Sequence, residues 1–484
     1  MKLLGKKSAT VALAVTMLAA LCASGCSPMQ QMQSTPEPFD TQKPLETPAA
    51  FVQVVALNAA SESSAATVSP TPAPTQPHSA SYLASGKSAN AGAAPAYKDV
   101  RGECKYAVSS NRSDFFYTRD TSMDSTWHAT KGKQSITIEP EDGVTDITGF
   151  YFKWDAAPPT WDLYAYDSAG KETLACSGGK NGGLTEFAPV PESMTGYRKF
   201  QFVSTNPEVP FAIANFSVYS GGVPEFAPRW EAYDGRAVDL LVISSHPDDE
   251  SVFLPAPAIT SINDGKVVVT GYMTWGTAKR RFEAEEACWM LGERYAPTLR
   301  AAHDMMTNSL ESMERYWPLD KAVGYVVELI RKFKPAVIVT HDVGGEYGHG
   351  AHIETSLAVQ LAFEQASDPT KYPDSAEQYG VWKPGKLYLH MYGKDKITYD
   401  LNAPLAAYNG ESILQVATSA FERHRSQAAK GWTVESTGEC SMALFGLFAS
   451  NVGPDTQHNS IFENIAPGTM EGLNGKGTEA SPNP

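Results

Sequence analysis

Cysteine is scarce in this chain of 484 residues. Six cysteines are present and none forms a Cys-x-x-Cys pattern, so metal ligation by cysteine is not expected. Long apolar runs are missing as well. The apolar run over residues 11–21 is too short to span a bilayer comfortably.

Basic residues are outnumbered and dispersed. The chain has 39 Lys and Arg against 54 Asp and Glu, a formal net charge of -15, and its basic residues are scattered along the sequence. Nucleic-acid binders gather such residues into a patch or stripe. The composition therefore excludes nucleic acid as a partner, and it indicates an acidic, soluble surface.

The first 25 residues have the composition of an export signal. Three lysines among the first seven residues precede the apolar run, which ends in Ala23-Ser-Gly-Cys26. This ending resembles a bacterial lipobox, in which the signal peptide is cut before the cysteine and the cysteine is lipidated. We therefore expect a lipoprotein signal peptide over residues 1–25 and an extracytoplasmic protein, lipid-anchored to the bacterial cell membrane at Cys26. A plain secretory signal peptide, cut nearby, is the alternative.

The cysteines beyond this segment could pair in an oxidising compartment. Cys104 and Cys176 fall within one expected domain, so they are the candidate pair. Cys288 lies in a helical pattern, where a buried free thiol is an equal alternative.

The length predicts more than one domain, because compact domains usually hold about 100 to 200 residues. Residues 26–98 are rich in Pro, Ala, Ser, Thr and Gln. Such a composition cannot bury enough apolar surface to offset its ordering entropy, so we expect a disordered tether there. Residues 467–484 are expected to form a disordered tail.

Residues 99–225 have the pattern of an antiparallel β-sandwich, since short runs of period-two alternation are separated by turn signals. The runs are residues 136–138, 150–154, 161–166, 200–202 and 211–219. Their ordering resembles discoidin-like or galactose-binding-like jelly rolls, which makes this domain a candidate carbohydrate-binding module. Trp127 and Trp161 could stack on a sugar face, and burial in the core of the sandwich is the alternative for both.

Residues 230–466 alternate strand and helix patterns, which predicts a Rossmann-like α/β domain with a mostly parallel sheet covered on both faces. The strand runs are residues 238–244, 266–272, 336–340 and 386–391, and the helical patterns include residues 281–291, 319–333 and 352–363. In such sheets ligands bind beyond the carboxyl ends of the strands.

Two polar motifs lie at those strand ends. His246-Pro-Asp-Asp-Glu250 follows the first strand, and the third strand is followed by a segment from His341 that contains His349 and His352. Histidine and carboxylate oxygen are suitable zinc ligands, and a catalytic zinc ion typically keeps three protein ligands and one open position. His246, Asp249 and His352 could supply that set.

The neighbouring side chains could complete a hydrolytic site. Asp248 is a candidate general base for a water proton, and His349 is a candidate acid that could also stabilise an oxyanion. The alternative for the first motif is a turn whose aspartate caps the following helix, and a lone His-x-x-His pair arises by chance. The combination at two strand ends of one domain favours the metal site.

The α/β domain resembles the PIG-L or LmbE-like family of zinc-dependent N-acetylglucosaminyl deacetylases, whose first motif reads His-Pro-Asp-Asp-Glu and whose second resembles Gly-His-Pro-Asp-His. The segments Arg280-Arg-Phe-Glu283 and His424-Arg-Ser-Gln427 also match patterns of that family. The resemblance implies zinc ligation by His246, Asp249 and His352, a base role for Asp248, an acid or oxyanion role for His349, and substrate contact by Arg280. Arg281 is the competing choice for that contact.

The sequence departs from the family at Gly350 and Ala351, where proline and aspartate are usual. The missing aspartate could otherwise orient the neighbouring histidine or adjust its pKa. Asp342 or Glu346 is the hypothetical substitute as a partner for His349.

The expected function is zinc-dependent hydrolysis of the acetamide of an N-acetylated amino sugar, of the N-acetylglucosamine or N-acetylgalactosamine type, in an extracellular glycan or glycoconjugate. Iron or cobalt would also suit the ligands. No protein partner is implied. The alternatives are a surface glycan-binding lipoprotein with a degenerate enzyme domain, and a hydrolase of another amide.

Overall fold

The computed structural model describes residues 97–475 except residues 121, 435 and 439. The expected signal peptide, the lipid anchor at Cys26 and nearly all of the tether lie outside the described residues, as do residues 476–484. Within the described part of the chain, no helix combines the length and the hydropathy that crossing a bilayer requires.

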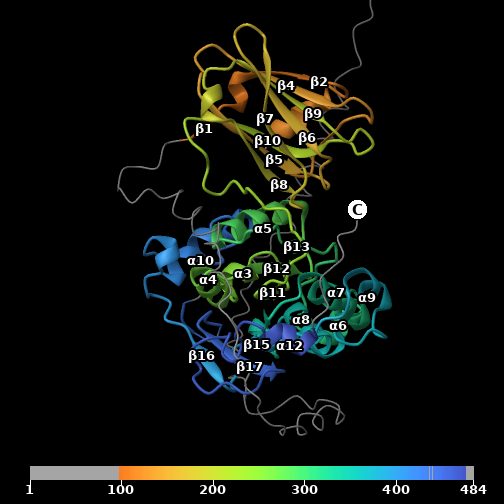
Figure 1. Cartoon of the computed structure of the whole chain (residues 1–484), viewed down its shortest axis with the longest axis vertical. Helices are drawn as coiled ribbons and strands as arrows, with labels where there is room; N and C mark the ends of the chain where they lie inside the picture. Colours follow the sequence, from red (N-terminus) through yellow and green to blue (C-terminus); the bar gives the residue numbers. More distant parts are fainter. Residues whose placement is uncertain (1–96, 121, 435, 439, 476–484) are drawn as a thin grey trace, which may run out of the picture. The chain divides into compact units, whose positions relative to one another are not determined.

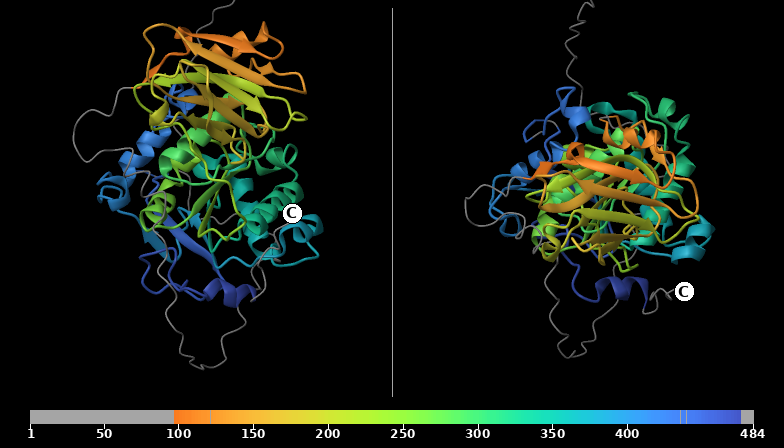
Figure 2. Two further views of the ribbon diagram at one scale, coloured as in Figure 1. Left: turned by 45° about the horizontal axis from the view of Figure 1, so that its top comes forward. Right: turned by 90° about the horizontal axis from the view of Figure 1, so that it is seen from above.

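Two antiparallel five-stranded sheets form the first domain, coloured orange to yellow-green in Figures 1 and 2. One sheet has the order β1-β10-β5-β8, with β3 paired to β10, and the other has the order β2-β4-β9-β6-β7. The strands are β1 (Lys98–Asp99), β2 (Cys104–Val108), β3 (Trp127–His128), β4 (Ser135–Pro140), β5 (Ile147–Trp154), β6 (Trp161–Tyr166), β7 (Glu172–Gly178), β8 (Thr185–Pro189), β9 (Lys199–Ser204) and β10 (Ala212–Ser220). Three short 3-10 helices join them: η1 (Arg101–Glu103), η2 (Asp114–Arg119) and η3 (Glu192–Met194). The predicted sandwich is therefore confirmed.

Aromatic side chains from both sheets fill the core of this sandwich. Phe152 of one sheet meets Phe202 of the other edge to face, with ring centroids 4.8 Å apart. Trp127 and Trp161 are 0% and 2% exposed and belong to the same core. Both tryptophans are therefore core residues, as the alternative to sugar stacking predicts, and neither ring is available to a ligand.

The candidate disulfide between Cys104 and Cys176 is wrong, because both thiols are free. Cys104 lies on β2 and Cys176 on β7, at opposite edges of one five-stranded sheet. Strands in a sheet are about 4.8 Å apart, whereas a disulfide needs Cα atoms within about 7 Å. Cys288 is a buried free thiol, as one of its two alternatives predicts.

The second domain contains a seven-stranded sheet with the order β13-β12-β11-β14-β15-β17-β16. The pairs from β13 to β15 are parallel, in the chain order 3-2-1-4-5 of doubly wound sheets. The pairs made by β17 are antiparallel, which the sequence analysis does not predict. The strands are β11 (Leu240–Ser244), β12 (Val268–Tyr272), β13 (Thr298–Leu299), β14 (Val337–Thr340), β15 (Lys386–His390), β16 (Lys396–Thr398) and β17 (Leu444–Ser450).

Helices cover both faces of this sheet because its strands alternate their apolar side chains. Leu240 and Val242 of β11 pack into one core, and Leu241 and Ile243 pack into another. The helices are α3 (Asp249–Val252), α4 (Pro255–Asn263), α5 (Ala278–Leu291), α6 (Leu310–Glu314), α7 (Leu319–Phe333), α8 (Gly350–Gln365), α9 (Pro373–Tyr379), α10 (Ile413–Phe421), α11 (Arg425–Ala428) and α12 (Thr469–Asn474), with 3-10 helices η4 (Glu346–Gly348) and η5 (Ala406–Tyr408). The residues of α4 and α10 join the first core, and those of α7 and α8 join the second.

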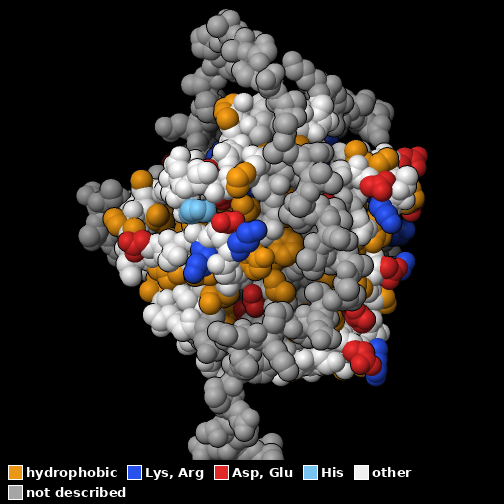
Figure 3. Space-filling view, turned by 90° about the horizontal axis from the view of Figure 1, so that it is seen from below, with side chains coloured by type: hydrophobic (Ala, Val, Ile, Leu, Met, Phe, Trp, Pro, Cys, Tyr) orange, Lys and Arg blue, Asp and Glu red, His pale blue; other side chains and the backbone are white. Residues whose placement is uncertain are grey.

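Helix α12 lies within residues 467–484, where a disordered tail is expected. Asn474 accepts a hydrogen bond from the backbone N–H of Lys383, and its side-chain amide donates to the carbonyl oxygen of that residue. The ordered part of the chain therefore extends into the expected tail. On the face that Figure 3 draws, acidic and basic side chains are interspersed, as the scattered charges of the sequence predict.

Candidate active site

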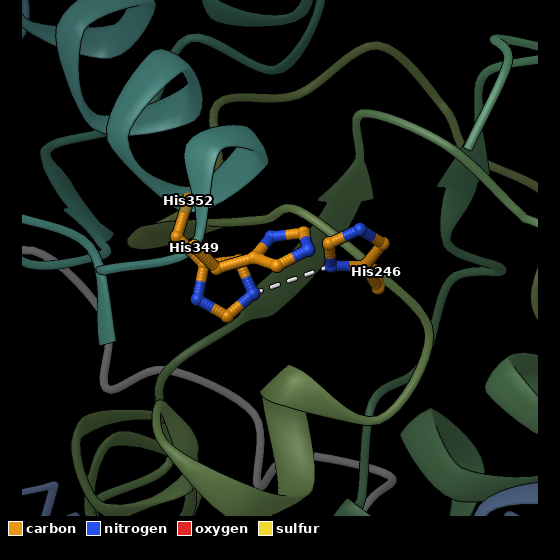
Figure 4. Close-up of side chains that lie close together, drawn as sticks. All are labelled: His246, His349 and His352. Carbon is orange, nitrogen blue, oxygen red and sulfur yellow. Dashed lines mark hydrogen bonds between the residues drawn. The ribbon is translucent and has the colours of Figure 1, made fainter. Parts of the chain in front are cut away.

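Two loops meet at the carboxyl edge of the parallel sheet. One follows β11 and leads into α3, and the other follows β14 and leads through η4 into α8. Because β11 and β14 are neighbouring parallel strands, their carboxyl ends lie side by side and the two motifs face the same space. Figure 4 shows the imidazole rings of His246, His349 and His352 grouped there.

The predicted ligands His246, Asp249 and His352 lie close enough to bind one ion. Nδ1 of His246 lies 3.2 Å from Nε2 of His352 and 3.4 Å from Oδ2 of Asp249. Oδ1 of Asp249 lies 3.4 Å from Nε2 of His352. Two ligands at normal bond lengths from a tetrahedral zinc ion are about 3.4 Å apart. The spacing of the predicted ligand set therefore fits a zinc ion.

Neighbouring carboxylates favour the histidine tautomers that such a site needs. Nε2 of His246 lies 3.1 Å from Asp304, and Nδ1 of His352 lies 2.7 Å from Glu346. A ring nitrogen beside a carboxylate carries the proton, which leaves the other nitrogen with a free lone pair. The two free lone pairs then point at each other and at the Asp249 carboxylate. Either a proton shared between the rings, as in the 3.2 Å hydrogen bond of His246 to His352, or a metal ion offsets the repulsion among these groups.

Two other candidate ligand sets each share two residues with this one. His246, His349 and His352 form one, and Asp249, His341 and His352 form the other, each with its ligand atoms within 4.8 Å of one another. His341 is the weaker candidate, because its Nε2 accepts a hydrogen bond of 2.9 Å from the backbone N–H of Ser245 and its Nδ1 lies 2.6 Å from Glu346. His341 is not among the site residues predicted from the sequence.

Asp248 lies beside the cluster in a strained backbone conformation, with φ of 134°. Its backbone N–H donates to Glu250, and Arg280 donates a hydrogen bond of 2.6 Å to its Oδ1. Burial raises the pKa of the Asp248 carboxyl to about 6, against the opposing effect of the Arg280 guanidinium. Strain of this kind is found mainly at functional sites, and a carboxyl with a raised pKa is suited to accept a proton.

The structure distinguishes between Arg280 and Arg281. Arg280 lines the pocket and also lies 3.6 Å from Asp304. Arg281 donates instead to the carbonyl oxygen and the carboxylate of Asp155 in the sandwich domain. Of the two candidates for substrate contact, only Arg280 is therefore placed beside Asp248.

His349 has neither of the two partners proposed for it. Glu346 contacts His341, His352 and His390, and Asp342 accepts from the backbone of Gly344. Nδ1 of His349 is buried without a hydrogen-bond partner among the described residues. Burial, together with repulsion from His352, lowers the pKa of His349 to about 4. The substitution hypothesis is therefore wrong, and the surroundings favour the neutral ring.

Asp304 and Tyr347 also belong to this pocket, although the sequence analysis singles out neither. Asp304 lies on the irregular segment between β13 and α6, which has no motif that would identify it. Tyr347 lies within the second motif, two residues before His349. The lining of the cavity, which measures about 280 Å³, consists of His246, Asp248, Asp249, Val252, Phe253, Arg280, Asp304, Met306, Tyr347, His349, Gln427, Lys430 and Trp432.

His424 lies outside this lining. Its ring is fully buried and Nε2 lies 2.6 Å from Glu250, the residue that also accepts from the backbone of Asp248. The structure thus gives His424 a supporting position behind the first motif.

A doubly wound sheet with a buried cluster of histidine and aspartate at its carboxyl edge, and a further carboxylate beside it, is typical of metal-dependent hydrolases. Residues 241–363 match the family model PIG-L, described as GlcNAc-PI de-N-acetylase. This part of the chain is a PIG-L family domain, and it contains every predicted site residue.

Two relatives have related activities in their names. A 1D-myo-inositol 2-acetamido-2-deoxy-alpha-D-glucopyranoside deacetylase of Geodermatophilus obscurus is 28% identical over 202 residues, which cover 36% of this chain and 67% of the relative. A mycothiol S-conjugate amidase of Streptomyces coelicolor is 31% identical over 178 residues, which cover 31% of this chain and 60% of that protein. The family match and these relatives support a metal-dependent deacetylase.

Solved structures resemble each domain separately. The N,N'-diacetylchitobiose deacetylase from Pyrococcus horikoshii is 20% identical, covers 40% of this chain and 71% of its own, and has a TM-score of 0.31. The family 32 CBM from C. perfringens NanJ, solved with galactose, is 13% identical, covers 26% of this chain and 100% of its own, and has a TM-score of 0.23.

Proposed function

We propose that this protein hydrolyses the acetamide of an N-acetylated amino sugar, with a zinc ion held by His246, Asp249 and His352. The convergence of two histidine nitrogens and the carboxylate oxygens of Asp249 at 3.2 to 3.4 Å carries the proposal. A bound zinc ion supplies a Lewis acid for the acetamide carbonyl and a source of hydroxide near neutral pH.

Asp248 removes the proton from the attacking water in this scheme. Its backbone is fixed by Glu250 and its carboxylate by Arg280, so the free oxygen is held beside the cluster without rearrangement. Val252 and Phe253 are buried apolar side chains that line the same cavity. They offer a surface for the methyl group of the acetyl.

His349 acts on the other side of the scissile bond. As a neutral ring it donates an N–H hydrogen bond to the oxygen that becomes negative in the tetrahedral state. The proton taken by Asp248 is then returned to the leaving amine, either directly or through His349. Arg280 and Asp304 offer a donor and an acceptor for the sugar hydroxyls at the edge of the cavity.

We further propose that the substrate belongs to an extracellular glycan or glycoconjugate. The motifs near the amino terminus support export and lipid anchoring at Cys26, which would present the enzyme on the outer side of the membrane. The sandwich could bind the same glycan through exposed aromatic residues such as Phe116 and Tyr117, which are 61% and 44% exposed.

The test is release of acetate from a panel of N-acetylated mono- and oligosaccharides by the full chain, loaded with zinc or treated with a chelator. Asp248→Asn should lower kcat by about 100- to 10,000-fold and leave zinc stoichiometry unchanged. Asp374→Asn, an exposed position on α9, is the matched control and should retain full activity.

The outcomes separate the candidate functions. Zinc-dependent release that Asp248→Asn loses supports the deacetylase. Zinc bound at one ion per chain with no acetate from any sugar would overturn it, and would favour a glycan-binding lipoprotein or a hydrolase of another amide.

A further inference from the structure

The mouth of the active-site cavity is aromatic and exposed, in contrast to its buried floor. Met306, Tyr347 and Trp432 are 75%, 48% and 41% exposed, and all three line the cavity. They come from three separate segments, which precede α6, form η4 and follow α11. Large apolar side chains with this much exposure are normally scattered singly over a surface, so their convergence at one opening needs an explanation.

The aromatic rings form a continuous wall from the metal-ligand cluster to the solvent. The ring centroid of Tyr347 lies 5.8 Å from that of His349 and 5.8 Å from that of Trp432. The planes of Tyr347 and Trp432 are inclined by 35°. Among the ring contacts of the described residues, Trp432 is therefore joined to the histidine cluster through Tyr347.

Tyr347 takes its position in this row of rings with a strained backbone conformation. Tyr347 has φ of 46°, a left-handed conformation that is uncommon for a bulky residue, and it lies between Gly345 and Gly348, which also have positive φ. Tyr347 remains 48% exposed, so burial offsets only part of the free energy that this conformation costs. Such strain is typical of segments that contact ligands.

Polar groups accompany the rings at the mouth. Lys430 is exposed and lines the same cavity, whereas Gln427 lines it from a buried position, 4% exposed, with its amide donating to Ser426. An exposed aromatic face with an exposed lysine as hydrogen-bond donor matches a pyranose ring, which has an apolar face of C–H groups and a rim of hydroxyls.

We infer that Trp432, with Tyr347 and Met306, forms a second sugar subsite, so that the enzyme acts on an N-acetylated sugar linked to another sugar in preference to the free monosaccharide. This inference rests on the proposed deacetylase function. The acetamido sugar occupies the floor beside Asp248, and the adjoining ring stacks on Trp432 while Lys430 donates to its hydroxyls.

The experiment compares N-acetylglucosamine with N-acetyllactosamine, lacto-N-biose and N,N'-diacetylchitobiose as substrates of the full zinc-loaded chain. The octyl glycoside of N-acetylglucosamine tests a merely apolar aglycone. Trp432→Ala should lower kcat/KM for the best disaccharide by about tenfold, equivalent to about 1.4 kcal/mol, mainly through KM. The value for the monosaccharide should not change.

Two further variants separate stacking from structure. Trp432→Phe should restore most of the disaccharide activity, and Leu174→Ala, which removes an exposed apolar side chain from β7 of the sandwich, should have no effect. Equal losses for mono- and disaccharide in Trp432→Ala, or an octyl glycoside that gains as much as the disaccharide, would overturn the subsite.

A binding measurement distinguishes failure of the subsite from failure of the proposed function. Calorimetry with the same disaccharides is run on the wild type and on Trp432→Ala. Disaccharide binding that the variant loses, without acetate release by either protein, keeps the subsite and rejects the deacetylase. Acetate release that is indifferent to Trp432 keeps the deacetylase and rejects the subsite, and the absence of both binding and release rejects both.

Discussion

Glu346 is enclosed by three histidine rings and is fully buried. Its carboxylate lies 2.6 Å from Nδ1 of His341, 2.7 Å from Nδ1 of His352 and 2.7 Å from Nδ1 of His390. Burial raises the pKa of this carboxyl, but the histidines outweigh burial and hold the pKa well below its usual range. An ionised Glu346 therefore fixes the ring of the proposed ligand His352 from behind.

Glu346→Gln is expected to weaken zinc binding by about 10- to 100-fold, because the amide removes the charge that orients His352 and makes its other nitrogen a better ligand. Competition with a chelating dye measures the zinc affinity directly. The control is Glu364→Gln, an exposed position on α8, the helix that carries His352, which should bind zinc like the wild type. An unchanged zinc affinity in Glu346→Gln would show that the carboxylate only neutralises the buried histidines.

Gly350, where the family motif usually has proline, forms a close contact between the start of α8 and the segment before α6. The backbone N–H of Gly350 donates a hydrogen bond of 2.6 Å to the carbonyl oxygen of Thr307, which a proline could not do. A Cβ atom at this position would lie 2.9 Å from the carbonyl oxygen of Ser309 and 3.0 Å from that of Thr307. The start of α8 thus holds the segment that brings Asp304 and Met306 to the cavity.

Gly350→Ala should displace this segment, lower the free energy of unfolding by about 1 to 3 kcal/mol, and raise KM more than it lowers kcat. Urea unfolding and steady-state kinetics measure the two effects. In α12, Gly472 has open space around the added atom, so Gly472→Ala is the control and should leave KM unchanged. A variant at Gly350 with wild-type KM would mean that the segment is held by other contacts.

The stability of the whole molecule depends on acidic groups buried away from the site. Glu293 follows α5 and accepts hydrogen bonds from the backbone N–H and the hydroxyl of Thr270 on β12. Burial raises the pKa of Glu293 to about 8. When folding raises the pKa of an acid, the acid contributes its full stabilisation at a pH below the pKa of the unfolded state, about 4.3. This stabilisation is lost as the pH rises through the pKa of the folded state.

Glu293→Gln removes this titration. As the pH rises from 5 to 9, the wild type loses stability and the variant does not. The difference in free energy of unfolding should therefore shift in favour of the variant by about 1 to 4 kcal/mol. Urea unfolding followed across that range tests the sign. The exposed control Glu364→Gln should show the pH dependence of the wild type, and parallel curves for wild type and Glu293→Gln would contradict the argument.

Most of the regular structure could be predicted from the sequence because its signals are local. The four buried strand runs correspond to β11, β12, β14 and β15, and the three helical patterns correspond to α5, α7 and α8. The antiparallel strands β16 and β17 are missing from the prediction. Their pairing joins residues far apart in the chain, and β17 is only partly buried, so its pattern lacks the continuous apolar run of the central strands.

The sequence by itself determined the residues of the proposed ligand set, since His246, Asp249 and His352 lie at the ends of strands whose burial is evident from composition alone. The tertiary structure decided the partners of these residues. It placed Asp304 beside His246, Glu346 behind His352, and Trp432 at the mouth of the cavity. A periodic pattern records which face of an element is buried, whereas contacts between irregular segments depend on where the packed elements bring them.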